Sequence, residues 1–382
     1  MTRARPLIDT QEFLSLSSFL NYQLSGEPVN WRGILDLLVG DKEAPVADDL
    51  LLDGLAYLGE AYGGQKRRLG PLAILHPIRA ASLLAMAQDE PSSLDLLTTL
   101  LHDKDEDIRE ELYEPDTWDH LEERYRRIVI QIDANANWFL HERLHFLTKP
   151  RGQCYNTYLG HLIENARGIP ALLAIKLADR LDNTLDLRVD LRDFTDSIHC
   201  FQVLFDILFV NAYRGLKLRQ PHPMARKING AMRLYQLYKN ALFLSLLRAA
   251  GPTLEPAADR LFLSLAVASI REAQTNLLHL FAYHIKEPGQ QRALLMDVLA
   301  YAHADGFHQV RRRGSHRLDG LFLNHFVFDS REQKREGLAA LYRDKSLMAS
   351  AAVAFIAVFA SFINDPTFFI RGISPAGITA QD

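Results

Sequence analysis

The sequence predicts an all-α protein, and three observations support this prediction. Most long stretches place apolar residues at helical spacing, and few show the strict alternation that is typical of strands. The clearest alternating stretch, residues 127–132, is short. Prolines and glycines fall between the helical stretches, where they end helices. With 382 residues, 48% of them hydrophobic, the chain is long enough for one large helical domain or two domains.

Four stretches carry the apolar face of a helix most clearly. Residues 95–102 hold four leucines at helical spacing. Residues 169–187 repeat the pattern, with the charged Asp179 inside the apolar run. Residues 201–210 and 232–247 follow the same spacing. The second half of the chain therefore reads as helical throughout, like the first.

Glycines and prolines divide the chain between these helices. Gly63-Gly64 and Gly70-Pro71 bracket a short basic loop. Pro221-His222-Pro223 predicts a stiff connector, because each proline restricts itself and the residue before it. We therefore expect one domain over residues 1–215 and an α-helical extension of unassigned role over 216–382.

Charge and cysteine content favour a cytoplasmic protein that binds neither nucleic acid nor membrane. The net charge of −4 gives no global attraction to nucleic acid or to an anionic membrane, so neither partner is expected. The two cysteines, Cys154 and Cys200, are too few for a disulfide framework and lack metal-ligand spacing, which fits a reducing compartment. Residues 1–10 lack the apolar core of a signal peptide.

One apolar stretch, residues 346–363, is compatible with two structures. It has no charged residue over a length at the lower edge of a membrane span. Its alanines and serines give it a weak drive to insert into lipid, so a buried helix or an oligomer interface is the favoured interpretation. We expect no membrane association, and homo-oligomerisation would use these C-terminal helices.

Two histidines and two aspartates form a candidate metal site: His76, His102, Asp103 and Asp179. Mixed imidazole and carboxylate ligands suit a borderline ion such as Mn²⁺, Fe or Zn²⁺ better than Mg²⁺ or Ca²⁺. An ion held by four such ligands keeps positions for water and substrate, and lowers the pKa of that water. Asp179 stands in an apolar helix, where a carboxylate is costly unless a metal or a cation such as Arg180 or Arg188 neutralises it.

An acidic pair, Glu106 and Asp107, stands next to this set. Glu106 follows His102 by four residues, which predicts that both side chains point the same way on one helix. The pair could then orient a water or carry its proton. The alternative is that the pair is a solvated helix end and that His76 only precedes a helix.

These motifs resemble the hydrolase domain of the RelA/SpoT family, HD-superfamily enzymes that degrade the alarmone (p)ppGpp of the stringent response. That family has a basic loop followed by His-Pro, then His-Asp-x-x-Glu-Asp, then Lys-Leu-Ala-Asp-Arg-Leu-x-Asn. Here the matching stretches lie within residues 50–200: 65–70 with His76-Pro77, residues 102–107, and residues 176–183. Thr148-Lys149 resembles a further family element between the second and third motifs.

The resemblance implies an HD-type helical bundle and a role for each matching residue. His76, His102, Asp103 and Asp179 would hold one Mn²⁺, and Glu106 and Asp107 would be the catalytic acidic pair. The residues implied in substrate binding are Lys66, Arg67, Arg68, Lys149 and Asn183. A guanidinium plane such as that of Arg67 can stack on guanine, and the flanking cations suit phosphate oxygens. The alternative for the basic loop is a solvated surface turn.

Three positions depart from the family pattern. Ala73 replaces an aromatic residue, Asp182 replaces a histidine, and Leu185 replaces an arginine that often follows the asparagine. We interpret these positions as lying near the nucleotide, so they bear on substrate identity more than on metal chemistry. The family's synthetase pattern does not appear in residues 200–382.

The sequence thus predicts a hydrolase-only enzyme that converts (p)ppGpp to GDP or GTP and pyrophosphate. Two alternatives stay open at this point. One keeps the metal chemistry but changes the substrate to (p)ppApp or NADPH. The other is a nucleotide sensor without turnover, although a sensor has no need of a water-activating acidic pair.

Overall fold

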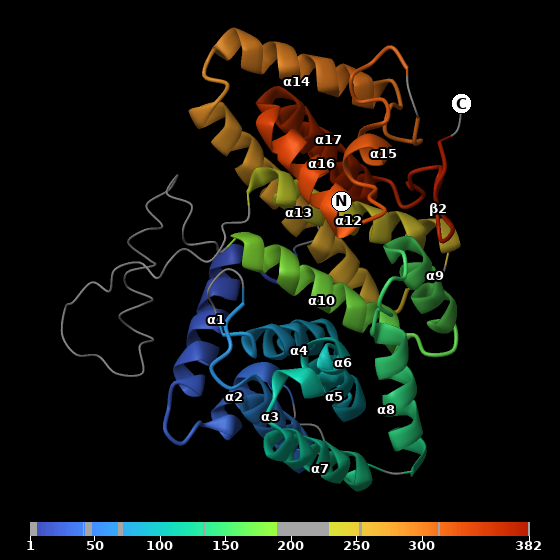
Figure 1. Ribbon diagram of the computed structural model, residues 1–382. Coiled ribbons are helices and arrows are strands. Elements are labelled where there is room, and N and C mark those ends of the chain that lie inside the picture. The colour runs from blue at the N-terminus through green and yellow to red at the C-terminus, as the bar shows by residue number, and fades with distance from the viewer. Residues whose placement is uncertain are drawn as a thin grey trace, which may run out of the picture. The chain divides into compact units, whose positions relative to one another are not determined.

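The chain is helical almost throughout, which confirms the predicted all-α class. The computed structural model describes residues 6–40, 42, 48–67, 72–132, 134–188, 229–251, 254–311 and 314–380 (Figure 1). Within these ranges the strands are confined to one small antiparallel hairpin, in which β1 (Ile373–Ser374) pairs with β2 (Gly377–Ile378). The alternating stretch at 127–132 lies almost wholly in a helix.

The described chain divides into two compact units. Unit 1 comprises residues 1–150, 165–227 and 254–261, and unit 2 comprises residues 151–164, 228–253 and 262–382. The predicted boundary between residues 215 and 216 lies outside the described residues. The grouping of residues 151–164 with unit 2 is a feature that the sequence pattern does not indicate.

Unit 1 is a bundle built around a buried helix, α4 (Leu75–Ala87). Helix α4 packs along α10 (Ala171–Arg188), and the two lie side by side in Figure 1. Almost every residue of α4 is buried, which is why its sequence lacks the polar face of a surface helix. The remaining helices of unit 1 are α1 (Thr10–Leu24), α2 (Trp31–Val39), α3 (Asp48–Tyr62), α5 (Ser93–Leu101), α6 (Lys104–Asp107), the 3₁₀ turn η1 (Glu110–Leu112), α7 (Pro115–Gln131) and α8 (Ala134–Leu147).

Local capping signals set several helix ends. Asp9 and Glu12 form a reciprocal capping box at the start of α1. The Ser92 side chain caps α5, and Pro115 occupies the first turn of α7, where its missing N–H leaves no bond unmade. Gly251 ends α12 (Gly230–Ala250) with φ of 60°, a left-handed conformation that glycine adopts without strain.

Three of the four predicted helices are confirmed. The stretch 95–102 lies in α5 apart from its last residue, 169–187 corresponds to α10, and 232–247 falls inside α12. The fourth, 201–210, lies outside the described residues.

Unit 2 contains helices and the β-hairpin. Its helices are α9 (Tyr155–Asn165), α12, most of α13 (Pro256–Tyr283), α14 (Pro288–His303), α15 (Leu321–His325), α16 (Arg331–Arg343) and α17 (Lys345–Asn364). Helix α17 contains the apolar stretch 346–363 and packs against α12, α14 and α16. Among the described helices it is the one that is long and apolar enough to cross a membrane, yet 61% of its apolar window is buried within the protein. That burial matches the expected buried helix.

Candidate metal centre

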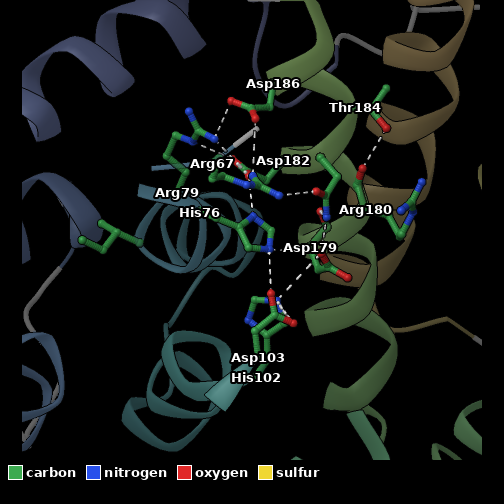
Figure 2. A network of polar contacts seen from close by, with 12 residues as sticks. Arg67, His76, Arg79, His102, Asp103, Asp179, Arg180, Asp182, Thr184 and Asp186 are labelled. Carbon is green, nitrogen blue, oxygen red and sulfur yellow. Dashed lines mark hydrogen bonds and ion pairs between the residues drawn. The ribbon is translucent and has the colours of Figure 1, made fainter. Parts of the chain in front are cut away.

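The four predicted ligands come from three neighbouring segments of unit 1 (Figure 2). His76 lies in the first turn of α4, where Pro77 is tolerated because the first N–H groups of a helix have no intrahelical partner. His102 follows the last residue of α5, and Asp103 directly precedes the short α6. Asp179 lies within α10. The packing of α4 and α5 against α10 therefore brings together residues that are up to 103 positions apart.

The side-chain atoms of these residues converge. Nε2 of His76 lies 3.2 Å from Asp103 Oδ2 and 3.4 Å from Asp179 Oδ1. Nε2 of His102 lies 3.3 Å from Asp103 Oδ1 and 3.8 Å from Asp179 Oδ1. The two rings meet edge to face, with centroids 5.1 Å apart. One ligand atom each from His76, His102 and Asp103 lies within 4.8 Å of the other two.

The hydrogen bonds of His102 fix which of its nitrogens faces the cluster. Its Nδ1 lies 2.7 Å from the backbone oxygen of Thr99, which can only accept, so Nδ1 carries a proton. Nε2 is buried and has no hydrogen-bond partner. A buried nitrogen without a partner is costly in the free protein, whereas a metal ion would use its lone pair.

His76 is fixed in the same sense. Its Nδ1 lies 2.6 Å from Oδ2 of Asp182, a carboxylate with no exposed surface. Because an ionised carboxylate accepts hydrogen bonds and does not donate them, Nδ1 of His76 is the donor. Both imidazoles therefore point Nε2 at the same place.

Both carboxylate oxygens of Asp179 have a partner. Its Oδ2 pairs with Lys176 Nζ at 2.8 Å, a cation that the sequence analysis did not consider as its partner. Its Oδ1, on the side of the histidines, accepts from Asn183 Nδ2 at 2.5 Å. One oxygen of Asp179 thus lies with the two Nε2 atoms while the other is neutralised.

The electrostatics reflect this crowding. Burial and the charge of Arg67 act to lower the pKa of His76, but its hydrogen bonds to three carboxylates outweigh them and hold it well above the ordinary value. Burial also acts to lower the pKa of His102. The carboxylates of Asp103 and Asp179 outweigh burial and raise this pKa above its ordinary value. Although burial would raise them, the pKa values of Asp103 and Asp179 are lowered by the cations around them.

This donor set fits a transition-metal ion. Two neutral imidazole nitrogens and two ionised carboxylates supply four ligands of the kind that Mn²⁺, Fe or Zn²⁺ accepts. The cluster is buried on the histidine side, with side-chain exposures of 5% for His76 and 1% for His102, while Asp103 keeps 24%. A site of this kind can be reached from solvent through Asp103.

The acidic pair lies on α6, and its geometry differs from the prediction. Helix α5 ends at Leu101, so His102 and Glu106 are not on one continuous helix, and the prediction that they share a helical face is wrong. The chain turns at Asp103, whose carbonyl accepts from the N–H groups of both Glu106 and Asp107. Asp107 Oδ2 accepts from Tyr62 Oη at 3.1 Å, and Glu106 Oε1 accepts from the backbone N–H of Lys149 at 2.9 Å.

The two acidic residues therefore have different surroundings. Desolvation of its carboxyl group and the charge of Asp103 raise the pKa of Asp107, so Asp107 lies within electrostatic reach of one candidate ligand. Both residues are exposed overall, but Glu106 bonds to the backbone of Lys149 instead of a buried tyrosine.

The predicted substrate-binding residues are only partly brought together. Arg67 Nη2 donates to Asn183 Oδ1 at 2.8 Å, and Asn183 Nδ2 in turn bonds to the candidate ligand Asp179. Lys66 is exposed at a bridge to Leu72, and the Lys149 ammonium group bonds to the neighbouring backbone. Arg68 lies outside the described residues.

A cavity of about 400 Å³ borders the acidic motif. Its lining includes Lys104, Asp105 and Thr148, which adjoin Asp103 and Lys149 in the sequence, but none of the four candidate ligands. The cavity is thus separate from the metal site, although it borders the same α6 segment.

Sequence reasoning missed a set of buried partners. Arg79, 1% exposed, donates to Asp182 at 2.7 Å and to Asp186 at 2.8 Å. Asp179, Asp182 and Asp186 are spaced i, i+3 and i+7, so all three lie on one face of α10. This spacing of carboxylates on an otherwise apolar helix is the sequence feature that could have indicated a buried cation such as Arg79. Asp182 and Leu185 are both buried, so neither departure from the family pattern lies at the surface.

Comparisons with known proteins do not identify a relative. No family model, curated protein or solved structure matches the chain.

Proposed function

We propose that the protein is a metal-dependent phosphohydrolase that removes the 3′-pyrophosphate of (p)ppGpp. One observation carries the proposal: both buried histidines have Nδ1 engaged by an acceptor and direct Nε2 toward the carboxylates of Asp103 and Asp179. Such an arrangement is typical of a metal site, because Nε2 of His102 is buried without a hydrogen-bond partner where a metal ion would use its lone pair.

The reaction follows from this set and from the acidic residues beside it. A bound Mn²⁺ would supply Lewis acidity and a lower pKa for a nearby water. The water oxygen forms a bond to the phosphorus that is linked to the ribose 3′ oxygen. The bond between that phosphorus and the 3′ oxygen breaks, the 3′ oxygen takes a proton, and pyrophosphate and GDP or GTP leave. Asp107, with its raised pKa, is the residue suited to carry the proton.

Recognition of the nucleotide is assigned to the basic residues next to the site. Arg67 has a side-chain exposure of 25%, so part of its guanidinium can face a ligand while the rest contacts Asn183 and α10. A guanidinium plane can stack on a purine, and Lys66 is exposed where a phosphate could approach. Guanine as the base rests on the resemblance of the motifs to the RelA/SpoT hydrolases.

The direct test is release of pyrophosphate from ppGpp by purified protein with Mn²⁺. Asp103→Ala removes one ligand, and Asp105→Ala is the matched control, because Asp105 lies two residues away and its carboxylate is 52% exposed. We expect turnover in the wild type and in Asp105→Ala, and loss of turnover in Asp103→Ala.

A substrate panel separates the alternatives. Turnover of ppApp or NADPH in place of ppGpp would keep the metal chemistry and change the substrate. Tight binding of these nucleotides without turnover of any would replace the hydrolase with a sensor. Metal-independent turnover, or full activity in Asp103→Ala, would contradict the proposal.

A further inference from the structure

A chain of buried polar groups runs from Arg79 through Asp182 to His76 (Figure 2). Arg79 Nε donates to Asp182 Oδ1 at 2.7 Å, and its Nη2 lies 3.2 Å from Oδ2. The same Oδ2 accepts from His76 Nδ1 at 2.6 Å. Exposures are 1% for Arg79, 0% for Asp182 and 4% for His76, so water does not compete with these bonds.

We infer that Asp182, held by Arg79, is a positioning residue that keeps His76 in the form that binds the metal. The inference rests on the metal centre of the proposed function and deepens it. Asp182 touches neither the metal position nor a substrate. It acts through His76, by fixing both the ring orientation and the nitrogen that carries the proton.

The nitrogen that carries the proton decides whether His76 can be a ligand. A neutral imidazole has one N–H and one lone pair, and only the lone pair can bind a metal. With the carboxylate of Asp182 at Nδ1, the proton stays there and Nε2 faces Asp103 and Asp179. Carboxylate partners of this kind orient metal-bound histidines and raise their basicity.

Asparagine at position 182 would reverse this preference. Arg79 presents two N–H groups to this side chain and would bind the single amide oxygen of an asparagine. The NH₂ group would then face His76 Nδ1, where a donor meets a lone pair. That contact favours the tautomer with the proton on Nε2. A protonated Nε2 has no lone pair with which to bind a metal. The shape of the site would change little, but a proton on Nε2 of His76 would prevent that atom from binding the metal.

Asp186 provides a matched control. It lies one turn further along α10, 5% exposed, and accepts from the same Arg79 at 2.8 Å. It also lies 3.4 Å from Arg67, as Asp182 lies 3.5 Å from it. Asp186 contacts Arg79 and Arg67, so Asp186→Asn removes a buried charge from the same network without a change at the imidazole.

The experiment measures metal affinity rather than activity. Mn²⁺ is titrated into wild-type, Asp182→Asn and Asp186→Asn proteins, and the free ion is followed by its electron paramagnetic resonance signal. We expect Asp182→Asn to weaken Mn²⁺ binding about 10- to 100-fold. We expect Asp186→Asn to weaken Mn²⁺ binding less than about threefold. Loss of a residue that hydrogen-bonds to a metal-binding histidine would have a larger effect. Circular dichroism and thermal unfolding of each variant report whether it is folded.

A second readout observes the imidazole nitrogens of the wild-type protein directly. In ¹⁵N-labelled wild-type protein loaded with Zn²⁺, long-range ¹H–¹⁵N spectra distinguish metal-bound from protonated imidazole nitrogens. We expect Nε2 of His76 to be metal-bound and its Nδ1 to carry a proton shifted far downfield by the short bond to Asp182. His76→Gln assigns the signals.

Each outcome has a distinct meaning. Equal weakening in both asparagine variants would overturn the inference, because Asp182 would then act only by balancing the charge of Arg79. Wild-type affinity in Asp182→Asn, or Zn²⁺ bound through Nδ1, would also overturn it. Failure of the wild-type protein to bind either metal would instead contradict the proposed function itself.

Discussion

Tyr62 donates a hydrogen bond to Asp107 across 3.1 Å, which connects the last residue of α3 to the acidic motif on α6. The tyrosine ring is buried, and desolvation together with the charge of Asp107 raises the pKa of its hydroxyl group. The hydroxyl group therefore stays protonated and acts as a donor over the whole working pH range. Asp107 thus has a fixed partner, whereas Glu106 is tied to the backbone of Lys149.

Tyr62→Phe is expected to lower kcat about tenfold by releasing the Asp107 carboxylate, a loss of about 1.4 kcal/mol in transition-state stabilisation. The free energy of unfolding should fall by only about 1 kcal/mol, as for the loss of one hydrogen bond. Tyr113→Phe is the control, since Tyr113 donates to the backbone oxygen of Ala61 and not to the acidic motif. Unchanged kcat in Tyr62→Phe would show that this bond has no role in the reaction.

The two acidic residues should differ when each carboxylate is replaced by its amide. Asp107→Asn removes the group that lies within electrostatic reach of Asp103, and kcat should fall about 100-fold or more. Glu106→Gln keeps an oxygen that can accept from Lys149 N–H, so kcat should fall about tenfold or less. Steady-state kinetics at saturating Mn²⁺ measures both. A loss in Glu106→Gln as large as that in Asp107→Asn would contradict this division of roles.

Arg79→Met should strongly destabilise the protein. The substitution keeps an unbranched apolar stem but leaves Asp182 and Asp186 buried without their cation, a situation that typically costs about 3–5 kcal/mol. Urea unfolding of the metal-free protein measures the change. Arg126→Met is the control, because its ion pair with Glu123 is largely exposed and should contribute about 1 kcal/mol or less. Comparable losses in the two variants would mean that the Arg79 network contributes no more than a surface pair.

Stabilisation by Mn²⁺ should increase with pH. The pKa values of His76 and His102 are raised in the metal-free fold. Their charged forms therefore add stability that is fully present below the unfolded value of about 6.5 and is lost as the pH rises through the folded values. A metal ion needs the neutral rings and so competes with these protons. The increase in Tm on adding Mn²⁺ should be small near about pH 6 and larger near about pH 8. An increase that is independent of pH would argue against histidine ligands.

Periodicity and local motifs were sufficient to predict the class of the fold, and they named four candidate ligands that the structure brings together. The leucines of residues 95–102 and the apolar residues around Asp179 are spaced for a helix that buries its apolar face in the core. Both stretches form such helices. Once both helices pack on α4, His102 and Asp179 meet near His76. Their convergence thus follows from burial of the same apolar faces that the sequence displays.

The supporting contacts could not be predicted in the same way. The bond between His76 and Asp182 spans 106 positions and depends on the rotation of α4 against α10, which apolar spacing does not specify. The break between α5 and α6 was missed because Asp103 to Asp107 contains no proline or glycine, the residues that usually signal a helix end. The role of Tyr62 depends on where α3 ends relative to α6, which only the tertiary structure gives.

The most direct test of the metal centre is anomalous scattering from crystals of the wild-type protein soaked in Mn²⁺, recorded at the manganese absorption edge. The account predicts one strong peak within coordination distance of Nε2 of His76, Nε2 of His102 and the carboxylates of Asp103 and Asp179. A peak at other residues, or none between these four at a Mn²⁺ concentration that supports turnover, would contradict it.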